Sequence, residues 1–198
     1  MVSVRVERKS EHDAVWGIHV LAFGQENEGN LVTVLRKAEG HDPELSLVAI
    51  IDHQVVGHIL FSPLAVRLFG DSAVGGEVAG DAPDFVDRED VWDESVEAGI
   101  PALALAPLAV RPDFQNQGIG SALVREGLEA ARLLGHRIVI VVGDPAYYGR
   151  FGFSPARPLG LVPSLDVPGD AFMAIELVPG ALAGVKGEVV YPAVFHTV

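Results

Sequence analysis

Alternation of apolar and polar positions opens the chain and predicts the order of its first elements. "VSVRVERK" has the period-two pattern of a strand, and Ser10 followed by Asp13 resembles a capping signal for a helix that runs through about Phe23. Helical spacing returns over about 28–38. "LSLVAIIDHQVVGHILFSPLAV" then predicts two strands around a turn at 52–54. The expected order is strand, two helices, two strands.

Two later runs, "ALALAPLAV" and "RIVIVVG", are apolar on both faces, as in buried central strands. A helical pattern over about 118–134, closed by Gly135, lies between them, so the strands should be parallel and joined by a right-handed crossover. Pro107 cannot donate to a ladder and therefore marks a bulge or a place where strands part. The pattern indicates an α/β protein with a central mixed sheet flanked by helices.

The remaining segments predict one domain over 1–198 with two less regular parts. About 70–99 read as an acidic insertion that is too short to form a core of its own: ten acids stand there against one base, Arg88. This insertion is either a lid or funnel for cationic ligands, or a solvated loop that improves solubility. In the variable C-terminal part, about 156–198, "AFMAIELV" and "GEVVY" predict strands, while the prolines at 163, 168, 179 and 192 make long helices unfavourable.

Composition narrows the chemistry. The apolar content of 49% is enough for a sizeable core, and no apolar run reaches the roughly 20 residues of a membrane helix. With no secretory signal at the N-terminus, we expect a cytoplasmic protein without a membrane partner. A net charge of −13 argues against nucleic acid as a partner. The absence of cysteine excludes disulfides, thiolate metal sites and a cysteine nucleophile.

The stretch "QNQGIG", 115–120, joins the first central strand to the helix that follows it. Ligands of parallel units lie at the carboxyl ends of the strands, and a helix N-terminus attracts phosphate through its unpaired amides. Gly118 and Gly120 would let a pyrophosphate approach the main chain, although an ordinary tight turn is an equal alternative. The Walker pattern lacks its lysine, and Leu123 stands where the dinucleotide fingerprint needs its third glycine.

A second informative stretch, "GDPAYYGRFGF", ends the other parallel strand. Asp144 suits an N-cap, Pro145 suits the first helical position and Gly152 suits the exit. A very short helix should therefore present Tyr147 and Tyr148 to the crevice that the glycine loop faces.

Taken together, these two motifs resemble those of the GNAT superfamily of acetyl-CoA-dependent N-acetyltransferases, in its bacterial branch of predicted acetyltransferases. Gln115 to Gly120 are similar to the family's acyl-CoA pyrophosphate loop, and "YYGRFGF" is similar to its tyrosine-to-Gly-Phe signature. The order of elements also matches from about residue 2 to 155.

The resemblance implies a GNAT-like fold, an acetyl-CoA cosubstrate and direct attack by a primary amine in a ternary complex. Tyr148 corresponds to the family's general acid, which protonates the departing thiolate, whereas Tyr147 is expected to pack. The resemblance also implies that main-chain groups of the splayed strand and the loop hold the cofactor: Leu108, Ala109, Val110, Gln115, Asn116, Gln117, Gly118, Ile119, Gly120, Ser121 and Ala122.

The acceptor side is less defined. Glu26 and Glu28 lie where the family shapes its acceptor site. An equal alternative is that both acids only stabilise the start of the helix, where the helix dipole favours negative charge. The general base is not identified, and His58 is read as a core histidine. The histidines show no metal spacing, so no metal is expected. The phosphate loop is neutral, which leaves Arg111, Arg125 or Arg150 as possible charge partners for the phosphates.

Three functions stay open at this stage. The first is acetyl transfer to an amine on a small molecule or a protein. The second is a non-catalytic module on the same fold that binds acyl-CoA or another protein, and the third is an enzyme for a different phosphate ligand. In this fold such a C-terminal tail often borders the acceptor site or a dimer partner, so a homodimer is possible.

Overall fold

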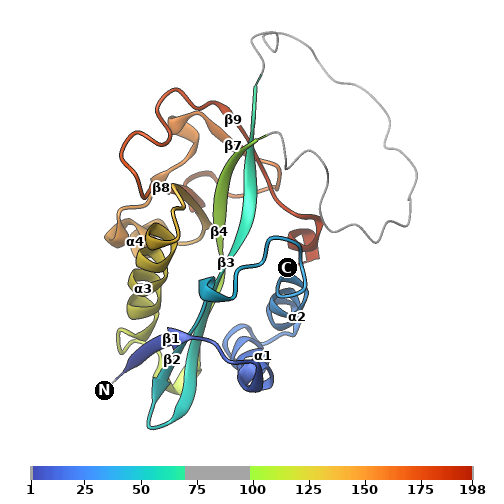
Figure 1. Cartoon of the computed structure of the whole chain (residues 1–198), viewed down its shortest axis with the longest axis vertical. Helices are drawn as coiled ribbons and strands as arrows, with labels where there is room; N and C mark the ends of the chain where they lie inside the picture. The colour runs from blue at the N-terminus through green and yellow to red at the C-terminus, as the bar shows by residue number, and fades with distance from the viewer. Residues whose placement is uncertain (1, 70–98, 198) are drawn as a thin grey trace, which may run out of the picture.

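The computed structural model describes residues 2–69 and 99–197, and within these residues nine strands form one mixed sheet (Figure 1). The helices are α1 (His12–Phe23), α2 (Asn27–Leu35), α3 (Ile119–Leu133) and α4 (Pro145–Tyr148). The strands are β1 (Ser3–Val6), β2 (Ser46–Ile51), β3 (Gln54–Leu68), β4 (Ile100–Val110), β5 (Ile138–Val142), β6 (Ser154–Pro155), β7 (Leu161–Pro163), β8 (Phe172–Glu176) and β9 (Gly187–Val190).

The main path through the sheet has the order β1-β2-β3-β4-β5-β8-β6. The predicted hairpin is confirmed: β2 and β3 are antiparallel, and Asp52 and His53 both have positive φ, as a two-residue primed turn requires. The predicted parallel pair is also confirmed, but β4 and β5 pair only at Leu103 with Val139 and at Ala104 with Ile140. Beyond these pairs, towards their carboxyl ends, the two strands part.

Pro107 lies where the ladder is irregular on both sides of β4. On the β3 side, Ile59 pairs with Leu108 and Phe61 with Leu105, so that Ala106 and Pro107 face Leu60 alone. This two-against-one arrangement is a β-bulge. On the β5 side the pairing has already ended. Both sequence predictions for this proline, a bulge and a parting of strands, are therefore confirmed.

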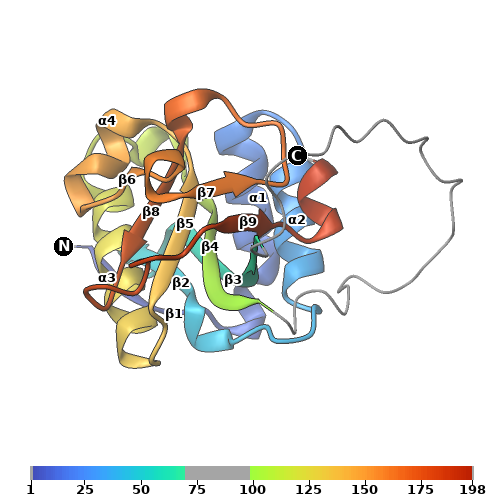
Figure 2. The same ribbon diagram turned by 90° about the horizontal axis from the view of Figure 1, so that it is seen from above.

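Helices cover the two faces of the sheet (Figure 2). On one face α3 buries Ile119, Leu123, Val124, Leu128 and Ala131, which recur at helical spacing. On the other face α1 and α2 pack into a separate apolar core together with the C-terminal segment. The sheet thus separates an α3 face from an α1/α2 face.

The C-terminal segment adds strands that the sequence shows only in part. The two predicted strands are β8 and β9, and the long helices disfavoured by the prolines do not occur in the described part of the tail. β9 pairs with the second half of β3 and, in parallel, with β7. β6 and β7 were not predicted. They have only two and three residues, which is too short for a periodic signal.

Two helix boundaries differ from the sequence predictions. Ser10 does not cap α1: Lys9–Glu11 form a 3-10 turn, and the Glu11 carboxylate accepts hydrogen bonds from the Arg8 amide and the Arg5 guanidinium, each at 2.9 Å. α2 ends at Leu35 rather than near 38. The acidic insertion lies outside the described residues, apart from Gly99. In the described segments no helix has the length and apolarity needed to cross a membrane.

Candidate functional site

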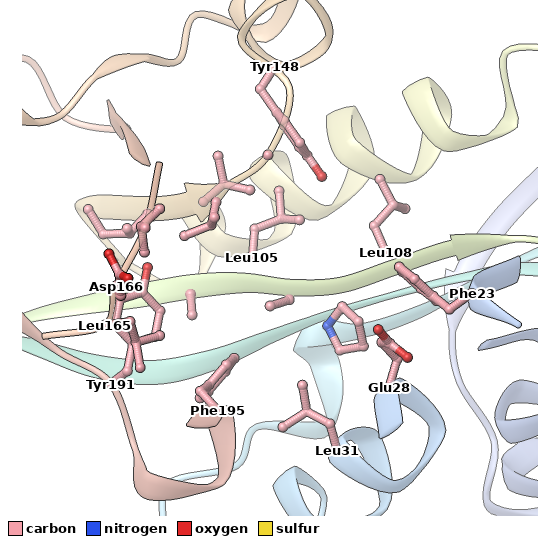
Figure 3. A pocket seen from close by; sticks show the side chains of 18 residues that line it. Phe23, Glu28, Leu31, Leu105, Leu108, Tyr148, Leu165, Asp166, Tyr191 and Phe195 are labelled. Carbon is pink, nitrogen blue, oxygen red and sulfur yellow. The ribbon is translucent and has the colours of Figure 1, made fainter. Parts of the chain in front are cut away.

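A cavity of about 610 Å³ passes through the sheet where β4 and β5 part. Leu105, Leu108 and Tyr148 line it from the α3 face, whereas Leu31 and Phe195 line it from the α1/α2 face. Figure 3 shows these two groups of side chains on opposite sides of β4. The missing β4–β5 pairing therefore opens a route from one face of the sheet to the other.

Tyr148 is fixed in this cavity by the turn that the sequence predicted. The Asp144 side chain caps α4 by accepting a hydrogen bond from the Ala146 amide at 2.9 Å. The Tyr148 ring packs edge-on against Phe153 and also lies against Gly143, where a β-carbon would come within 2.3 Å of it. Burial, and secondly the neighbouring Tyr147, raise the pKa of the Tyr148 phenol. The hydroxyl is therefore protonated at neutral pH and can donate.

A second hollow, of about 480 Å³, lies at the glycine loop and shares Leu108 with the cavity. Gly118, the N-cap of α3, has φ 82°, which only glycine adopts at little cost, and nothing lies within 4 Å of the position a β-carbon would take. The first intrahelical bond runs from the Ala122 amide to the Gly118 carbonyl at 3.0 Å. The amides of the preceding helical residues therefore have no partner within the helix.

The side-chain amides of two glutamines support this loop by donating hydrogen bonds to main-chain carbonyls. The Gln115 side chain donates to the Val110 carbonyl at 2.9 Å, and the Gln117 side chain donates to the Asp113 carbonyl at 3.2 Å. Both bonds tie the loop to the end of β4 and the turn after it. The open main chain at the N-terminus of α3 is thus held by the side chains around it.

Of the three candidate cations, Arg150 lines the second hollow. Its guanidinium lies 4.5 Å from the centre of the Tyr147 ring, and its Nε donates to the Tyr147 carbonyl at 3.1 Å. Arg111 instead donates to the Asp113 carboxylate at 2.9 Å, and Arg125 lies over the Phe151 ring. Tyr147 also lines this hollow, with its hydroxyl beside Gly120. Tyr147 also packs against Tyr148 and Phe151, as the sequence predicted.

The structure brings most of the predicted cofactor residues together. Ala109, Gln117 and Ala122 line neither hollow, and Ala109 is buried. The following predicted residues line the second hollow: Leu108, Val110, Gln115, Asn116, Gly118, Ile119, Gly120 and Ser121.

The two acidic residues at the start of α2 have different positions. Glu28 lines the cavity and is half-buried, with the Gln25 side chain donating to its carboxylate at 3.0 Å. Glu26 is the exposed N-cap residue of α2 and does not line the cavity. The structure therefore places only Glu28 at the cavity, whereas nothing in the sequence favoured either residue over the other.

The resemblance suggested that the tail borders the acceptor site, but sequence reasoning named none of the tail residues that line the cavity. Leu165, Asp166, Val167 and Tyr191 line it from segments that follow β7 and β9. No motif marks these residues, because they meet only through the pairing of two short strands. The reading of His58 as a core histidine is confirmed, since it is fully buried and bonded to His19 and Ser46. Within residues 2–69 and 99–197 no cluster of three or more His, Asp or Glu could hold a metal ion.

Comparisons with known proteins agree with this geometry. A model of the Acetyltransferase (GNAT) family matches residues 12–153. YhbS of Escherichia coli K12, an uncharacterized N-acetyltransferase, is 31% identical over 195 residues, which cover 98% of each chain. YjhQ of the same strain, also an uncharacterized N-acetyltransferase, is 35% identical over 147 residues; these cover 74% of this chain and 66%, just under two thirds, of YjhQ.

Two solved structures extend the comparison to three dimensions. The crystal structure of Escherichia coli YhbS in complex with CoA superposes with a TM-score of 0.77 at 30% identity, covering 98% of this chain and 92% of YhbS. That of a GNAT family acetyltransferase from Brucella melitensis in complex with acetyl-CoA gives 0.68 at 29% identity, with 98% of each chain covered. The matched family region includes both motifs and the β4 part of the cavity lining, whereas the lining residues of the C-terminal segment lie outside it. The chain belongs to the GNAT acetyltransferase family.

Proposed function

We propose that this protein transfers the acetyl group of acetyl-CoA to a primary amine by direct attack within a ternary complex. The observation that carries the proposal is the cavity that crosses the sheet between β4 and β5. A thioester entering from the α3 face and an amine entering from the α1/α2 face would meet inside it. Such an arrangement supplies proximity without a covalent enzyme intermediate.

The cosubstrate would lie along the carboxyl end of β4. Leu108 and Val110 offer main-chain groups for the pantetheine arm and the acetyl carbonyl, since this edge of β4 has no β5 partner. The pyrophosphate would sit on the first-turn amides of α3 next to Gly118 and Gly120, where the helix dipole favours negative charge. Arg150 adds a positive charge to this hollow.

Transfer requires a leaving group that is stabilised as the C–S bond breaks. The amine lone pair attacks the carbonyl carbon, the thiolate of CoA departs, and the products are an N-acetyl amide, CoA and one proton from the original ammonium. We assign Tyr148 as the donor to the thiolate, because its protonated phenol lines the cavity. Since its phenol pKa is raised above 10 and a thiol ionises near about 8.5, its main contribution is a hydrogen bond, with full proton transfer uphill.

The acceptor must lose a proton before it attacks, because a primary ammonium with a pKa near about 10 is not nucleophilic. Glu28, in the first turn of α2, lines the α1/α2 side of the cavity. We assign it to the acceptor site as the candidate base, acting directly or through water. Glu26 is given no such role.

The test begins with calorimetric titration of the protein with acetyl-CoA, CoA, ATP and NAD. Acetyl-CoA and CoA should bind selectively, and Gly118→Asp should abolish binding by placing a side chain and a negative charge at the pyrophosphate. Gly135→Asp is the matched control, since Gly135 also has a positive φ and open space but lies at the far end of α3. Binding of nucleotides in place of acetyl-CoA would indicate an enzyme for another phosphate ligand.

Turnover then separates an enzyme from a binding module. Tyr148→Phe should lower kcat on a panel of primary amines at least about tenfold while acetyl-CoA binding is preserved. A wild-type protein that binds acetyl-CoA and acetylates no amine of the panel would favour the non-catalytic module, and an unchanged kcat in Tyr148→Phe would remove the assigned donor.

A further inference from the structure

The α1/α2 side of the cavity contains a pocket whose walls come from the C-terminal segment. Parallel pairing of β7 and β9 places the chain after β7, Leu165 to Val167, near the chain after β9, Tyr191. The Tyr191 amide donates to the Ser164 hydroxyl at 3.1 Å, which joins the two segments. The 3-10 helix Ala193–Thr197 packs against α2 and brings Phe195 to the same cavity as Leu31. We call this region the acceptor pocket.

One polar group in the acceptor pocket is not explained by the fold. Tyr191 lines the cavity and is only 6% exposed, yet its hydroxyl has no hydrogen-bond partner among the described residues. Burial raises the pKa of the phenol, so the group is a neutral hydroxyl that can donate or accept. Leaving a buried hydroxyl unpaired is costly, and the cost is removed if a ligand supplies the partner.

The surroundings of this hydroxyl define the rest of the ligand. Leu31, Val167 and Phe195 give the acceptor pocket apolar walls, and the Tyr191 ring stacks edge-on against Phe195 at 5.4 Å. Among the described residues that line the cavity, the charged side chains are two carboxylates, Glu28 and Asp166, with no Lys, Arg or His. Figure 3 shows Asp166 and Tyr191 towards one end and Glu28 towards the other. Anionic acceptors are disfavoured there, and cationic ones are attracted.

We propose that the acceptor is a primary amine on an apolar chain that ends in a second polar group, a hydroxyl or another amine and not a carboxylate, and that Tyr191 recognises this group by a hydrogen bond. The proposal rests on the proposed function, since it names the substrate class of the same site. Tyr191 is a specificity-determining residue here and takes no part in the bond changes. Asp166 adds discrimination by charge.

Four matched amines test this assignment: hexylamine, 6-amino-1-hexanol, 1,6-diaminohexane and 6-aminohexanoate, with the chain varied from four to eight carbons. They share the reacting amine and differ only in the terminal group. In the wild type, kcat/KM for the amino alcohol should exceed that for the alkylamine by about tenfold or more, and the carboxylate should be the poorest acceptor. Asp166→Asn should reduce the penalty against the carboxylate.

Tyr191→Phe should abolish the preference for the amino alcohol by lowering its kcat/KM to the value for the alkylamine. It should also keep or raise Tm, because the hydroxyl it removes has no hydrogen-bond partner in residues 2–69 and 99–197. Tyr147→Phe, which also removes a phenol but faces the cofactor hollow, should affect both amines equally. A preference that survives in Tyr191→Phe would overturn the proposal.

A binding measurement separates this proposal from the proposed function. The four amines are titrated into the wild type and Tyr191→Phe, each saturated with CoA. Tighter binding of the amino alcohol, lost in the variant, supports the recognition role even if turnover is not detected. Equal binding of amino alcohol and alkylamine overturns it while leaving acetyl transfer intact. Failure of acetyl-CoA itself to bind counts against the proposed function.

Discussion

Tyr148 reaches into the cavity only because the residue at the end of β5 has no side chain. A β-carbon on Gly143 would lie 2.3 Å from Cε2 and 2.9 Å from Cδ2 of the Tyr148 ring, well inside van der Waals contact. Tyr147, one residue earlier on α4, faces the other hollow. Two adjacent tyrosines therefore serve different parts of one site, and a glycine fixes which of them enters the cavity.

Gly143→Ala should consequently act on catalysis through Tyr148. We expect kcat to fall about as far as in Tyr148→Phe, since the ring must leave its position, while acetyl-CoA binding changes little. Steady-state kinetics with calorimetry checks this. Gly149→Ala is the control, because no atom lies within 4 Å of its β-carbon position. Equal kinetics in both variants would contradict the steric argument.

Arg150 should supply the charge that the neutral loop lacks. Arg150→Gln is expected to raise the Kd for acetyl-CoA by about tenfold and to weaken its salt dependence, because a charge near a phosphate is screened by salt. Arg125→Gln removes an arginine that also lies by Phe151 but does not line the hollow, and it should leave Kd near the wild-type value. The comparison fails if both substitutions weaken binding equally.

Glu28 and Glu26 offer a matched test of the acceptor site. Glu28→Gln should lower kcat/KM for amines by about a hundredfold at neutral pH, the scale expected for loss of a general base, with acetyl-CoA binding unchanged. Glu26→Gln should be close to wild type, since that side chain is exposed and outside the cavity. Parallel pH profiles of kcat/KM provide the measurement, and similar losses in the two variants would assign both to the helix start.

At the scale of elements, α3 lies so close to β3 that one helical position admits no side chain. A β-carbon on Gly127 would come within 2.3 Å of Cε2 of Phe61, a fully buried ring on β3. Ile119, Leu123, Val124 and Leu128 pack around this contact. The close approach explains a glycine in the middle of a helix, where it otherwise reduces stability.

Replacing helical glycines by alanine should therefore have opposite effects in two helices. Gly127→Ala is expected to lower the free energy of unfolding by about 1–3 kcal/mol, because overpacking against Phe61 outweighs the gain in helix propensity. Gly17→Ala in α1, where nothing lies within 4 Å, should raise it by about 0.5–1 kcal/mol. Urea unfolding of both variants gives the two values. A stabilising Gly127→Ala would show that the ring moves freely.

Elements with strong local signals could be predicted from the sequence. The period of α3, the turn at Asp52 and His53, the Asp144 cap and the bulge at Pro107 each depend on a few neighbouring residues. β6 and β7 could not be predicted, because their stability comes from partners far along the chain. The site divides in the same way: loop and tyrosine motifs are local, whereas Asp166 and Tyr191 meet the cavity only through the β7–β9 pairing.

At the scale of the whole molecule, a buried polar chain connects five separate segments. The Arg36 guanidinium and the Ser46 hydroxyl both donate to the Glu7 carboxylate, Ser46 at 2.6 Å. Because the Ser46 hydrogen is used there, its oxygen accepts from Nε2 of His58 at 3.0 Å. Nδ1 of His58 then accepts from Nε2 of His19 at 2.9 Å. This direction of donors requires His58 to be neutral, because its Nδ1 must accept a hydrogen bond. His19 could donate in either protonation state, and its lowered pKa keeps it neutral as well.

The pKa values of Glu7, His19 and His58 are all lowered, but for different reasons. Burial lowers the pKa of His58, although the nearby Glu7 opposes this shift. Burial, and then the neighbouring His58 and Arg36, lower the pKa of His19 to about 2. Burial alone would raise the pKa of Glu7, but the nearby His58, 3.7 Å away, the hydrogen bond from Ser46 and the charge of Arg36 outweigh this and hold it at about 2. All three groups therefore bind protons less readily in the folded state.

Acid should consequently destabilise the protein in two separate ranges. A histidine in the unfolded chain has a pKa of about 6.5 and binds a proton below that pH, whereas these histidines stay unprotonated in the folded chain. The free energy of unfolding is therefore highest above about pH 6.5. Below it, each histidine lowers this free energy by about 1.4 kcal/mol per pH unit. Glu7 contributes only below about pH 4.5, the ordinary carboxyl pKa. Between pH 6 and 5 the decline therefore reports His19 and His58, with His41 and His136 adding in the same direction.

Urea unfolding at pH 7, 6 and 5 measures this slope directly. His19→Gln should reduce it by about one proton equivalent, because glutamine keeps a donor for His58 and does not titrate. His53→Gln, at the exposed hairpin turn, should leave the slope unchanged. If the slope is the same in both variants, proton uptake by the buried pair does not govern acid stability, and the network must tolerate charge. If only His19→Gln flattens it, the two histidines are neutral links in a directed hydrogen-bond network that locks the α1/α2 face onto the sheet.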